Sequence, residues 1–230
     1  MKTLLITGAN RGIGLEFSKQ YAAEGWRVLA CSRNPSDEIE KLAARYHELV
    51  KPHVLDVSEH GQIEQLGELL RDESIDLLIN NAGIYPDSGS QGFGHTDYGK
   101  WAQAFTVNTM ATLRMAETFF EQISRSKLKT IATVSSKMGS ISENSGGSDY
   151  LYRSSKAAVN MVVKSLAIDL NPHRIIAVVL HPGWVKTDMG GPNALISVEE
   201  SVSGMRRVIS GLKMTDSGKF FAYDGRHVPW

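Results

Sequence analysis

The stretch Thr7-Gly8-Ala9-Asn10-Arg11-Gly12-Ile13-Gly14 follows a short apolar run, Leu4–Ile6, and precedes a segment with helical periodicity. Glycines here let the backbone turn tightly and approach a phosphate, and the N-terminus of the next helix offers free N–H groups and a favourable dipole. The spacing is G-x-x-x-G-x-G rather than G-x-G-x-x-G, so incidental turn glycines are the competing interpretation. The position directly after the first apolar run favours a dinucleotide site.

Apolar runs of strand type recur along the chain and alternate with segments of helical spacing. The runs are Leu4–Ile6, Val28–Ala30, Val54–Leu55, Ile75–Ile79, Thr130–Val134, Ile175–Leu180 and Lys219–Ala222. One of the segments between them predicts a long helix through Phe105, Met115, Phe119 and Ile123. The alternation predicts a single α/β domain over residues 1–230, of Rossmann type, with a doubly wound, mostly parallel, seven-stranded sheet and helices on both faces. The irregular segments 81–99, 135–149 and 181–196 each follow a strand, so we expect them at the ligand-binding edge of the sheet.

Composition excludes several classes of function. The chain has 230 residues, and its 25 Lys and Arg balance its 25 Asp and Glu, which argues against nucleic acid or an anionic membrane as a partner. No apolar run is long enough to span a membrane, and the run after Met1 is too short for a secretory signal. A lone cysteine, Cys31, fits a reducing compartment, so we expect a cytoplasmic protein. The histidines show no ligand spacing, which predicts no metal.

The residues at the end of the second strand indicate whether NAD or NADP binds. NAD sites usually place an acidic residue there, but Ala30–Pro35 contains none, and the next acid is Asp37. Arg33 and Arg11 are instead available to meet a 2′-phosphate, which predicts NADP(H); the alternative is that both are solvated surface residues. Asp56 could bind the adenine amino group or cap the next helix, a role for which Ser58 competes.

Tyr152 and Lys156 stand four residues apart at the start of a predicted helix. This spacing puts both side chains on one helical face, with Cβ atoms about 5–6 Å apart. A neighbouring ammonium favours the phenolate and should lower the pKa of Tyr152, which could then give a proton to a carbonyl oxygen. Tyr150 is the rival phenol but has Ser154, not lysine, four residues on. An isolated pair of this kind is usually an ordinary surface pair, so the interpretation depends on the rest of the chain.

The remaining features occur in a telling order: Asn80-Asn81-Ala82-Gly83 after the fourth strand, Asn108 in a long helix, Ser135-Ser136 after the fifth strand and Pro182-Gly183 after the sixth. With Thr7–Gly14 and Tyr152/Lys156, they resemble the short-chain dehydrogenase/reductase family over essentially the whole chain. The stretches Val134–Ser140, His181–Met189 and Tyr223–Trp230 look like the subgroup of C-factor and sniffer-type carbonyl reductases.

The resemblance implies a role for each residue. Tyr152 would be the general acid, Lys156 would bind the nicotinamide ribose and lower the pKa of Tyr152, Ser136 would bind the substrate carbonyl, and Asn108 would hold a relay water. The expected cofactor-binding residues are Gly8, Asn10, Arg11, Gly12, Ile13, Gly14, Arg33, Asp56, Val57, Asn80, Ala82, Gly83, Tyr152, Lys156, Pro182, Gly183, Val185 and Thr187.

Two departures from the family pattern leave alternatives open. The separation of Ser136 from Tyr152 is wider than in many members, which we interpret as a loop insertion, with Ser135 and Ser140 as competing serines. His181 stands where many members carry Asn, and we expect a turn residue there rather than a catalytic one.

The partners and the function are also expectations. Trp101, Phe105, Met115 and Phe119 are candidates for the interface of a homodimer or homotetramer, or else pack against the sheet. We expect the segments Ile84–Gly99 and Gly190–Ser201 to wall the substrate pocket. The expected function is NADPH-dependent reduction of a small aldehyde or ketone. The alternatives are an NADP(H)-binding regulatory or signalling module with incidental turnover, and an NAD-dependent alcohol dehydrogenase.

Overall fold

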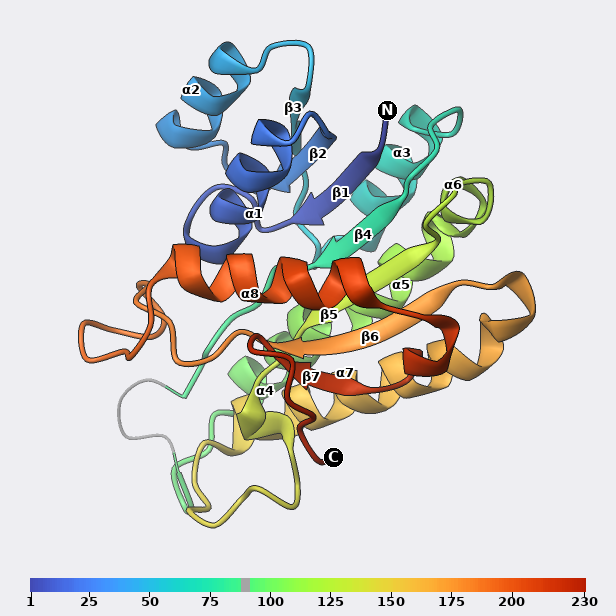
Figure 1. The fold of residues 1–230 in the computed structure, drawn as a ribbon. Helices are drawn as coiled ribbons and strands as arrows, with labels where there is room; N and C mark the ends of the chain where they lie inside the picture. Colours follow the sequence, from blue (N-terminus) through green and yellow to red (C-terminus); the bar gives the residue numbers. More distant parts are fainter. Residues whose placement is uncertain (88–91) are drawn as a thin grey trace.

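The computed structural model describes residues 1–87 and 92–230, and these form a seven-stranded parallel sheet with helices on both faces (Figure 1). The strand order is β3-β2-β1-β4-β5-β6-β7. The strands are β1 Thr3–Thr7, β2 Arg27–Ser32, β3 Val50–Val54, β4 Leu77–Asn80, β5 Thr130–Val134, β6 Ile176–His181 and β7 Phe220–Ala222. The α-helices are α1 Gly12–Ala23, α2 Asp37–Arg45, α3 His60–Leu69, α4 Tyr98–Phe105, α5 Ala111–Thr118, α6 Phe120–Ser124, α7 Tyr150–Asp169 and α8 Val198–Gly211. The predicted Rossmann-type α/β fold is confirmed.

Alternate strand residues feed two separate cores, as the twofold period of a strand requires. Leu5, Leu29 and Leu78 point to the face covered by α3, α5, α6 and α7. Leu4, Ile6 and Leu77 point to the opposite face, covered by α1, α2 and α8. Because both faces are covered, the central strands are buried along their whole length.

The third strand lies earlier than predicted. Its bounds are Val50–Val54, and Leu55 follows it rather than belonging to it. This strand is at the edge of the sheet, pairs on one side with β2 alone, and reads Val-Lys-Pro-His-Val, so it has no apolar run. Val54 is exposed, while Leu55 packs into the core. An edge strand tolerates proline and polar residues. The prediction followed the apolar pair Val54–Leu55 and therefore placed the strand too late in the chain.

The predicted long helix through Phe105 and Ile123 is interrupted. It divides into α4, a π-helical turn η1 at Thr106–Met110, then α5 and α6. Met115 and Phe119 are buried inside the chain, so they pack against the sheet and are not interface residues. The Trp101 indole N–H donates to Ser154 Oγ at 2.8 Å, which ties α4 to α7.

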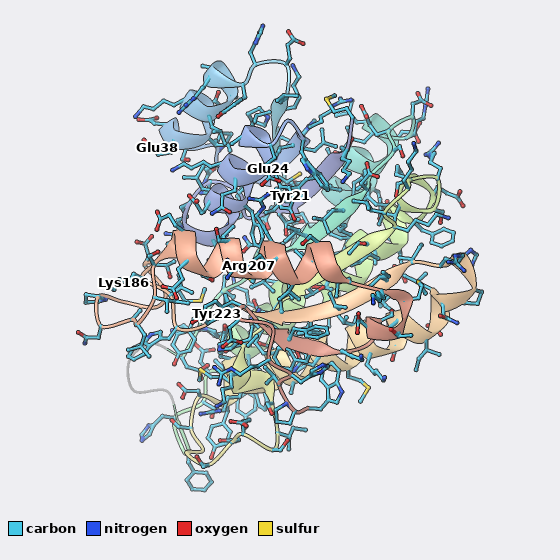
Figure 2. All side chains as sticks on the ribbon, viewed as in Figure 1. Tyr21, Glu24, Glu38, Lys186, Arg207 and Tyr223 are labelled. Carbon is cyan, nitrogen blue, oxygen red and sulfur yellow. The ribbon has the colours of Figure 1, made fainter. Side chains whose placement is uncertain are left out.

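Helix α8 crosses the sheet and packs beside α1 (Figure 1). Tyr21 on α1 and Glu24, the C-cap residue of α1, lie next to α8 (Figure 2). The Arg206 guanidinium lies 4.5 Å from the Tyr21 ring centroid and pairs with the Glu24 carboxylate. Burial raises the pKa of Tyr21 to about 12, so this phenol is a neutral packing residue. Among the helices of residues 1–87 and 92–230, none is both long and apolar enough to cross a bilayer.

Phe119 tests the core beneath the site. Its side chain is fully buried, so Phe119→Ala should reduce the free energy of unfolding by about 3–5 kcal/mol through lost burial and a residual cavity. Phe93 is 91% exposed, so the matched Phe93→Ala variant should change it by less than about 0.5 kcal/mol. Urea denaturation followed by circular dichroism measures both; equal effects would contradict the described packing.

Candidate active site

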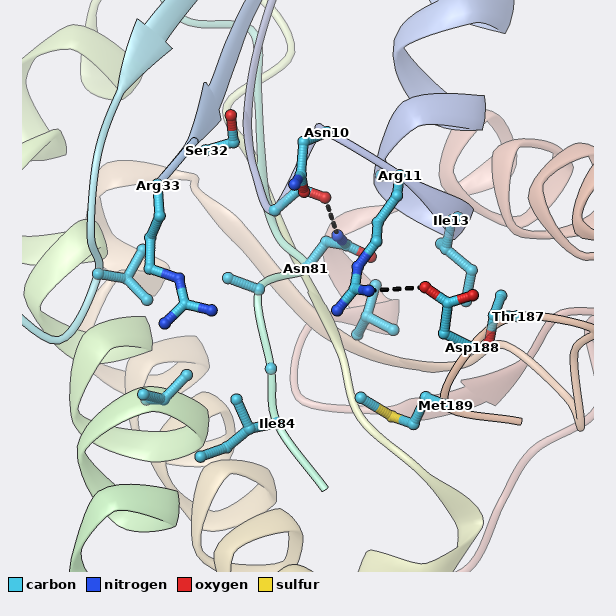
Figure 3. A pocket seen from close by; sticks show the side chains of 18 of the residues that line it. Asn10, Arg11, Ile13, Ser32, Arg33, Asn81, Ile84, Thr187, Asp188 and Met189 are labelled. Carbon is cyan, nitrogen blue, oxygen red and sulfur yellow. Dashed lines mark hydrogen bonds and ion pairs between the residues drawn. The ribbon is translucent and has the colours of Figure 1, made fainter. Parts of the chain in front are cut away.

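A cleft of about 660 Å³ opens at the carboxyl ends of the strands, where the strand order reverses between β1 and β4. Its walls come from the glycine loop, the end of β2, residues 55–58, residues 81–84, the start of α7 and the loop after β6. Figure 3 shows the side chains from the glycine loop, the end of β2, residues 81–84 and the loop after β6. Chains leaving β1 and β4 go to opposite faces of the sheet, so the edge between them is left open. This is the place where open α/β sheets bind ligands.

The glycine loop leaves the first turn of α1 uncovered. Gly8 has φ of +68°, and a Cβ at Gly14 would overlap the Gly8 carbonyl oxygen, so both positions require glycine. The N-cap residue of α1 is Arg11, whose side chain makes no capping hydrogen bond. The free N–H groups and the helix dipole therefore face the cleft, which suits a phosphate.

Asn81, a residue that sequence reasoning left out of the site, joins the two strands at the switch point. Its Nδ2 donates to the carbonyl oxygens of Thr7 at 2.9 Å and Gly8 at 3.2 Å. In return, the Thr7 hydroxyl accepts from the backbone N–H groups of Asn81 and Ala82 at 3.1 Å each. The shape of the glycine loop therefore depends on the segment after β4. The repeated asparagine in Asn80-Asn81 was the available signal.

The two candidate arginines differ in their surroundings (Figure 3). Arg11 Nη1 pairs with Asp188 Oδ2 at 2.6 Å, and both side chains are exposed. The Arg33 side chain extends from the end of β2 into the cleft and makes no hydrogen bond or ion pair with residues 1–87 or 92–230. Arg33 is thus the arginine available to an anionic group, while Arg11 links the glycine loop to the loop after β6.

Asp56 lines the cleft and does not cap a helix. Its Oδ1 accepts from the Ser58 backbone N–H at 2.9 Å and from the Ser58 hydroxyl at 2.6 Å. Helix α3 begins at His60 with Glu59 as its N-cap residue, so neither of the two candidates for that role, Asp56 and Ser58, is the N-cap residue. Asp56 Oδ2 stays available to a donor in the cleft.

Tyr152 and Lys156 lie on the buried face of α7 and both line the cleft. Lys156 Nζ is 5.7 Å from the centroid of the Tyr152 ring and donates to the Val134 carbonyl oxygen at 3.1 Å. That carbonyl is the last of β5, so the ammonium bridges the sheet edge to the helix. The pair is therefore inside the site and not on the surface.

The protein's own groups set the pKa values of this pair. Burial raises the pKa of Tyr152 to about 12, although a hydrogen bond with the Ser136 side chain works to lower it. Burial lowers the pKa of Lys156 to about 8. The expected lowering of the Tyr152 pKa by Lys156 is therefore not seen, because desolvation of the phenolate is the largest effect on this group. The phenol keeps its proton at neutral pH.

Ser136 is the serine beside Tyr152. The competing hydroxyls have internal partners: Ser135 Oγ donates to Asn160 Oδ1 at 2.7 Å, and Ser140 Oγ donates to the Trp230 carbonyl oxygen at 3.0 Å. Ser136 Oγ accepts from the Met138 backbone N–H at 3.1 Å. Of the three, Ser136 has its hydroxyl at the phenol.

Asn108 lies in the π-helical turn, a type of distortion common at functional sites. Its Oδ1 accepts from the Ile84 N–H at 2.8 Å, and its Nδ2 donates to the Ile84 carbonyl oxygen at 3.0 Å and to Ser155 Oγ at 3.0 Å. A Cβ at Gly83 would sit 3.2 Å from Asn108 Oδ1 and 3.5 Å from Lys156 Nζ, so glycine keeps these groups close. Asn108 therefore fixes the loop after β4 against α7.

The start of α7 is held by the same loop. Both oxygens of the buried Asp87 carboxylate accept from its first turn, from the backbone N–H groups of Leu151 at 3.2 Å and Tyr152 at 2.7 Å. The Tyr85 ring packs edge-on against Tyr152 with centroids 4.8 Å apart, and its hydroxyl donates to Asp149 Oδ1. This loop replaces a local side-chain cap, because Asp149 at the N-cap makes none.

Most predicted site residues meet at this cleft, but five do not line it: Asn80, Asn108, Ser136, Gly183 and Val185. Ser136 and Asn108 lie just behind it, Asn80 and Val185 are buried, and Gly183 packs against the Tyr223 ring. Part of the expected wall, residues 88–91, is outside the described residues. Sequence reasoning also missed several lining residues: Ser32, Ser58, Asn81, Lys186, Asp188 and Met189.

Two further sequence expectations concern metal binding and His181. In the described part of the chain, no cluster of three His, Cys, Asp or Glu side chains could hold a metal. His181 Nδ1 accepts from the Lys137 backbone N–H at 3.2 Å, and burial is the main cause that lowers the His181 pKa to about 4. The neutral ring therefore supports the turn that carries Ser136.

Comparison with known proteins agrees with this fold. The chain is 46% identical over 157 residues to the C-signal protein of Myxococcus xanthus. The matched region covers 68% of this chain and 93% of that protein. The structure matches NADPH-bound carbonyl reductase from chicken fatty liver with a TM-score of 0.92 and 34% identity, covering 100% of this chain and 99% of that one. It matches the carbonyl reductase Sniffer of D. melanogaster with a TM-score of 0.91 and 32% identity, covering all of both chains.

The short chain dehydrogenase family model matches residues 2–195. The chain belongs to the short-chain dehydrogenase/reductase family and is an oxidoreductase, and the resemblance to the C-factor and sniffer-type subgroup is confirmed.

The lowered pKa of Lys156 predicts a pH-dependent stability. Between pH 8 and the ordinary lysine value of 10.5, the unfolded chain holds this proton and the folded chain does not, so this group makes stability rise with pH. Lys156→Met removes the buried amine and should have a higher free energy of unfolding than wild type at pH 8. This difference should become smaller from pH 8 to pH 10, because wild type gains stability over that range. Urea denaturation at each pH measures the difference. The exposed Lys164→Met, on the same helix, is the control; a Lys156→Met difference that stays constant with pH would contradict the burial.

Proposed function

We propose that the protein reduces the carbonyl group of a small aldehyde or ketone with NADPH. The observation that carries this proposal is a single cleft that contains the uncapped start of α1, the buried pair Tyr152 and Lys156, and Arg33, which has no hydrogen bond or ion pair with the described residues. The carbonyl reductase relatives support the same reaction.

The chain's residues would supply a proton and hold the substrate. The bound cofactor supplies hydride to the carbonyl carbon. The carbonyl oxygen takes the π electron pair and receives the Tyr152 proton, which yields the alcohol. The Ser136 hydroxyl beside Tyr152 would hydrogen-bond the same oxygen. Lys156, with its pKa lowered to about 8, can pass a proton back to Tyr152 near neutral pH.

The preference for NADPH is supported by the end of β2. Ser32 and Arg33 line the cleft there, with no carboxylate to bind a ribose 2′-hydroxyl. A guanidinium without a protein partner can form paired hydrogen bonds with a phosphate. Asn108 would hold a relay water behind Lys156, since Gly83 leaves both side chains near each other.

A second candidate function is a regulatory module whose cofactor occupancy controls a partner. Its support is the 46% identity with a protein named C-signal. The buried phenol and ammonium argue against it, because binding alone does not need a proton donor. Tight NADPH binding with no turnover of any aldehyde or ketone in a broad panel would favour this candidate.

Replacing the proton donor separates catalysis from binding. Tyr152→Phe should lower kcat for carbonyl reduction by roughly 10²–10⁴-fold, because the proton donor is lost, while NADPH binding stays near wild type. NADPH absorbance across a panel of aldehydes and ketones measures the rate, and NADPH fluorescence measures binding. Tyr150→Phe, two residues away and exposed, is the matched control and should retain the wild-type rate. A wild-type rate in Tyr152→Phe would end the proposal.

Replacing Arg33 tests cofactor choice. Arg33→Ala should weaken NADPH binding by roughly 10–100-fold, the effect of about 1.5–3 kcal/mol in lost charged hydrogen bonds, and leave NADH binding unchanged. Arg45→Ala, on α2 outside the cleft, should change neither. Fluorescence titration with both cofactors decides it; an equal loss for both, or no loss for NADPH, would remove the 2′-phosphate role.

A further inference from the structure

Asn160 continues the row that Tyr152 and Lys156 begin on α7, four residues beyond the lysine. It is 3% exposed, and both ends of its carboxamide are used. Its Oδ1 accepts from Ser135 Oγ at 2.7 Å, and its Nδ2 donates to the Gly139 carbonyl oxygen at 3.1 Å. We propose that Asn160 is a positioning residue that holds the Ser136 turn against α7, an inference that rests on the proposed carbonyl reduction.

The two hydrogen bonds lie on either side of Ser136. Ser135 directly precedes it, and Gly139 ends the short 3₁₀ turn Lys137–Gly139 that follows it. One rigid carboxamide therefore fixes both ends of the turn. The Ser136 hydroxyl, held between them, lies at the Tyr152 phenol. Because Tyr152 and Asn160 belong to the same helix, a single element sets the distance between the two hydroxyls.

Gly139 shows how closely this turn packs against α7. A Cβ there would lie 2.7 Å from the Lys156 carbonyl carbon and 2.8 Å from its Cβ, so only glycine fits. The Ser135 hydroxyl also lies 3.5 Å from the Lys156 carbonyl oxygen. The turn is therefore in contact with the helix backbone at Lys156. One helical turn further along α7, the Asn160 carboxamide adds two hydrogen bonds to the same turn.

Other contacts hold the outer side of the turn but do not connect it to Tyr152. The Trp230 carbonyl oxygen accepts from the Ile141 N–H at 2.7 Å, and the Trp230 ring stacks on Phe220. The His181 ring accepts from the Lys137 N–H. These contacts come from the C-terminal segment and β6. Removal of Asn160 would leave the turn attached to them and free to shift away from α7.

The loss of Asn160 should affect the chemical step and spare the cofactor site. Asn160→Ala leaves the buried Gly139 carbonyl oxygen without the Asn160 donor and the Ser135 hydroxyl with only its longer contact, 3.5 Å to the Lys156 carbonyl oxygen, so the turn can move to satisfy both groups. A displacement of about 1 Å in a reacting group can lower a rate by roughly 10²-fold. The two hydrogen bonds of the Asn160 carboxamide go to Ser135 and Gly139, and neither goes to Lys156, Arg33 or the glycine loop. We therefore expect kcat to fall while NADPH affinity is unchanged.

A double-mutant cycle separates positioning from general stability. The proteins are wild type, Asn160→Ala, Ser136→Ala and the double variant, assayed with the best carbonyl compound from the panel. NADPH fluorescence and thermal unfolding are measured in parallel. Val163→Ala, in the core on the same helix, is the matched control and should lower the melting temperature without lowering kcat. If Asn160→Ala does not fold, Ser135→Ala removes one of the two hydrogen bonds and takes its place in the cycle.

The expected result is strong coupling between the two sites. Asn160→Ala should lower kcat by roughly 10–100-fold in the wild-type background and by less than about threefold once Ser136 is already alanine. Equal losses in both backgrounds, or a wild-type kcat in Asn160→Ala, would overturn the positioning role and leave the proposed function intact. A wild-type kcat in Ser136→Ala would instead overturn the serine's part in the proposed function and, with it, this inference.

Discussion

The buried ammonium of Lys156 is the constraint on which the rest of the site depends. A charged amine out of water is unfavourable unless something pairs with it, and here the last carbonyl of β5 accepts its hydrogen bond. This contact fixes α7 on the edge of the sheet. It thereby places Tyr152, one turn earlier, and Asn160, one turn later, relative to the strand ends. Burial disfavours the charged form of Lys156 and lowers its pKa to about 8. Burial of the neighbouring Tyr152 side chain keeps its phenol protonated.

The sheet topology supplies the other half of the site. Reversal of the strand order between β1 and β4 opens the cleft, and Asn81 then ties the two strand ends together through Thr7 and Gly8. The loop after β4 reaches α7 as well, through Asn108 and Asp87. A loop that contacts both the cofactor side and the phenol side couples the two. The geometry of the glycine loop and of Tyr152 is thus set by one connected network.

Much of this arrangement could be predicted from the sequence, because strong local patterns carry it. The alternation of apolar runs predicts the sheet, and the glycine spacing and the Tyr152–Lys156 interval predict the two sides of the cleft. The bounds of the third strand were predicted wrongly because an edge strand with Pro52 and His53 has no apolar run. The prediction of one continuous helix through Phe105 and Ile123 failed because apolar spacing does not mark a π turn, and the Asn108 contact with Ile84 joins residues 24 positions apart. The Tyr152 pKa was predicted in the wrong direction because spacing shows a neighbouring charge and does not show burial.

The central proposal is that a nicotinamide cofactor binds in the cleft beside Tyr152 and Lys156. Its most direct test is an ultraviolet difference titration of Tyr152, obtained by subtraction of the Tyr152→Phe spectrum, with and without NADP⁺. Without NADP⁺ the pKa should be about 12, the value set by the protein's own groups. With NADP⁺ the positive ring should lower the pKa of Tyr152 clearly, since a nearby cation favours the phenolate. A pKa that does not change when NADP⁺ binds would contradict the account.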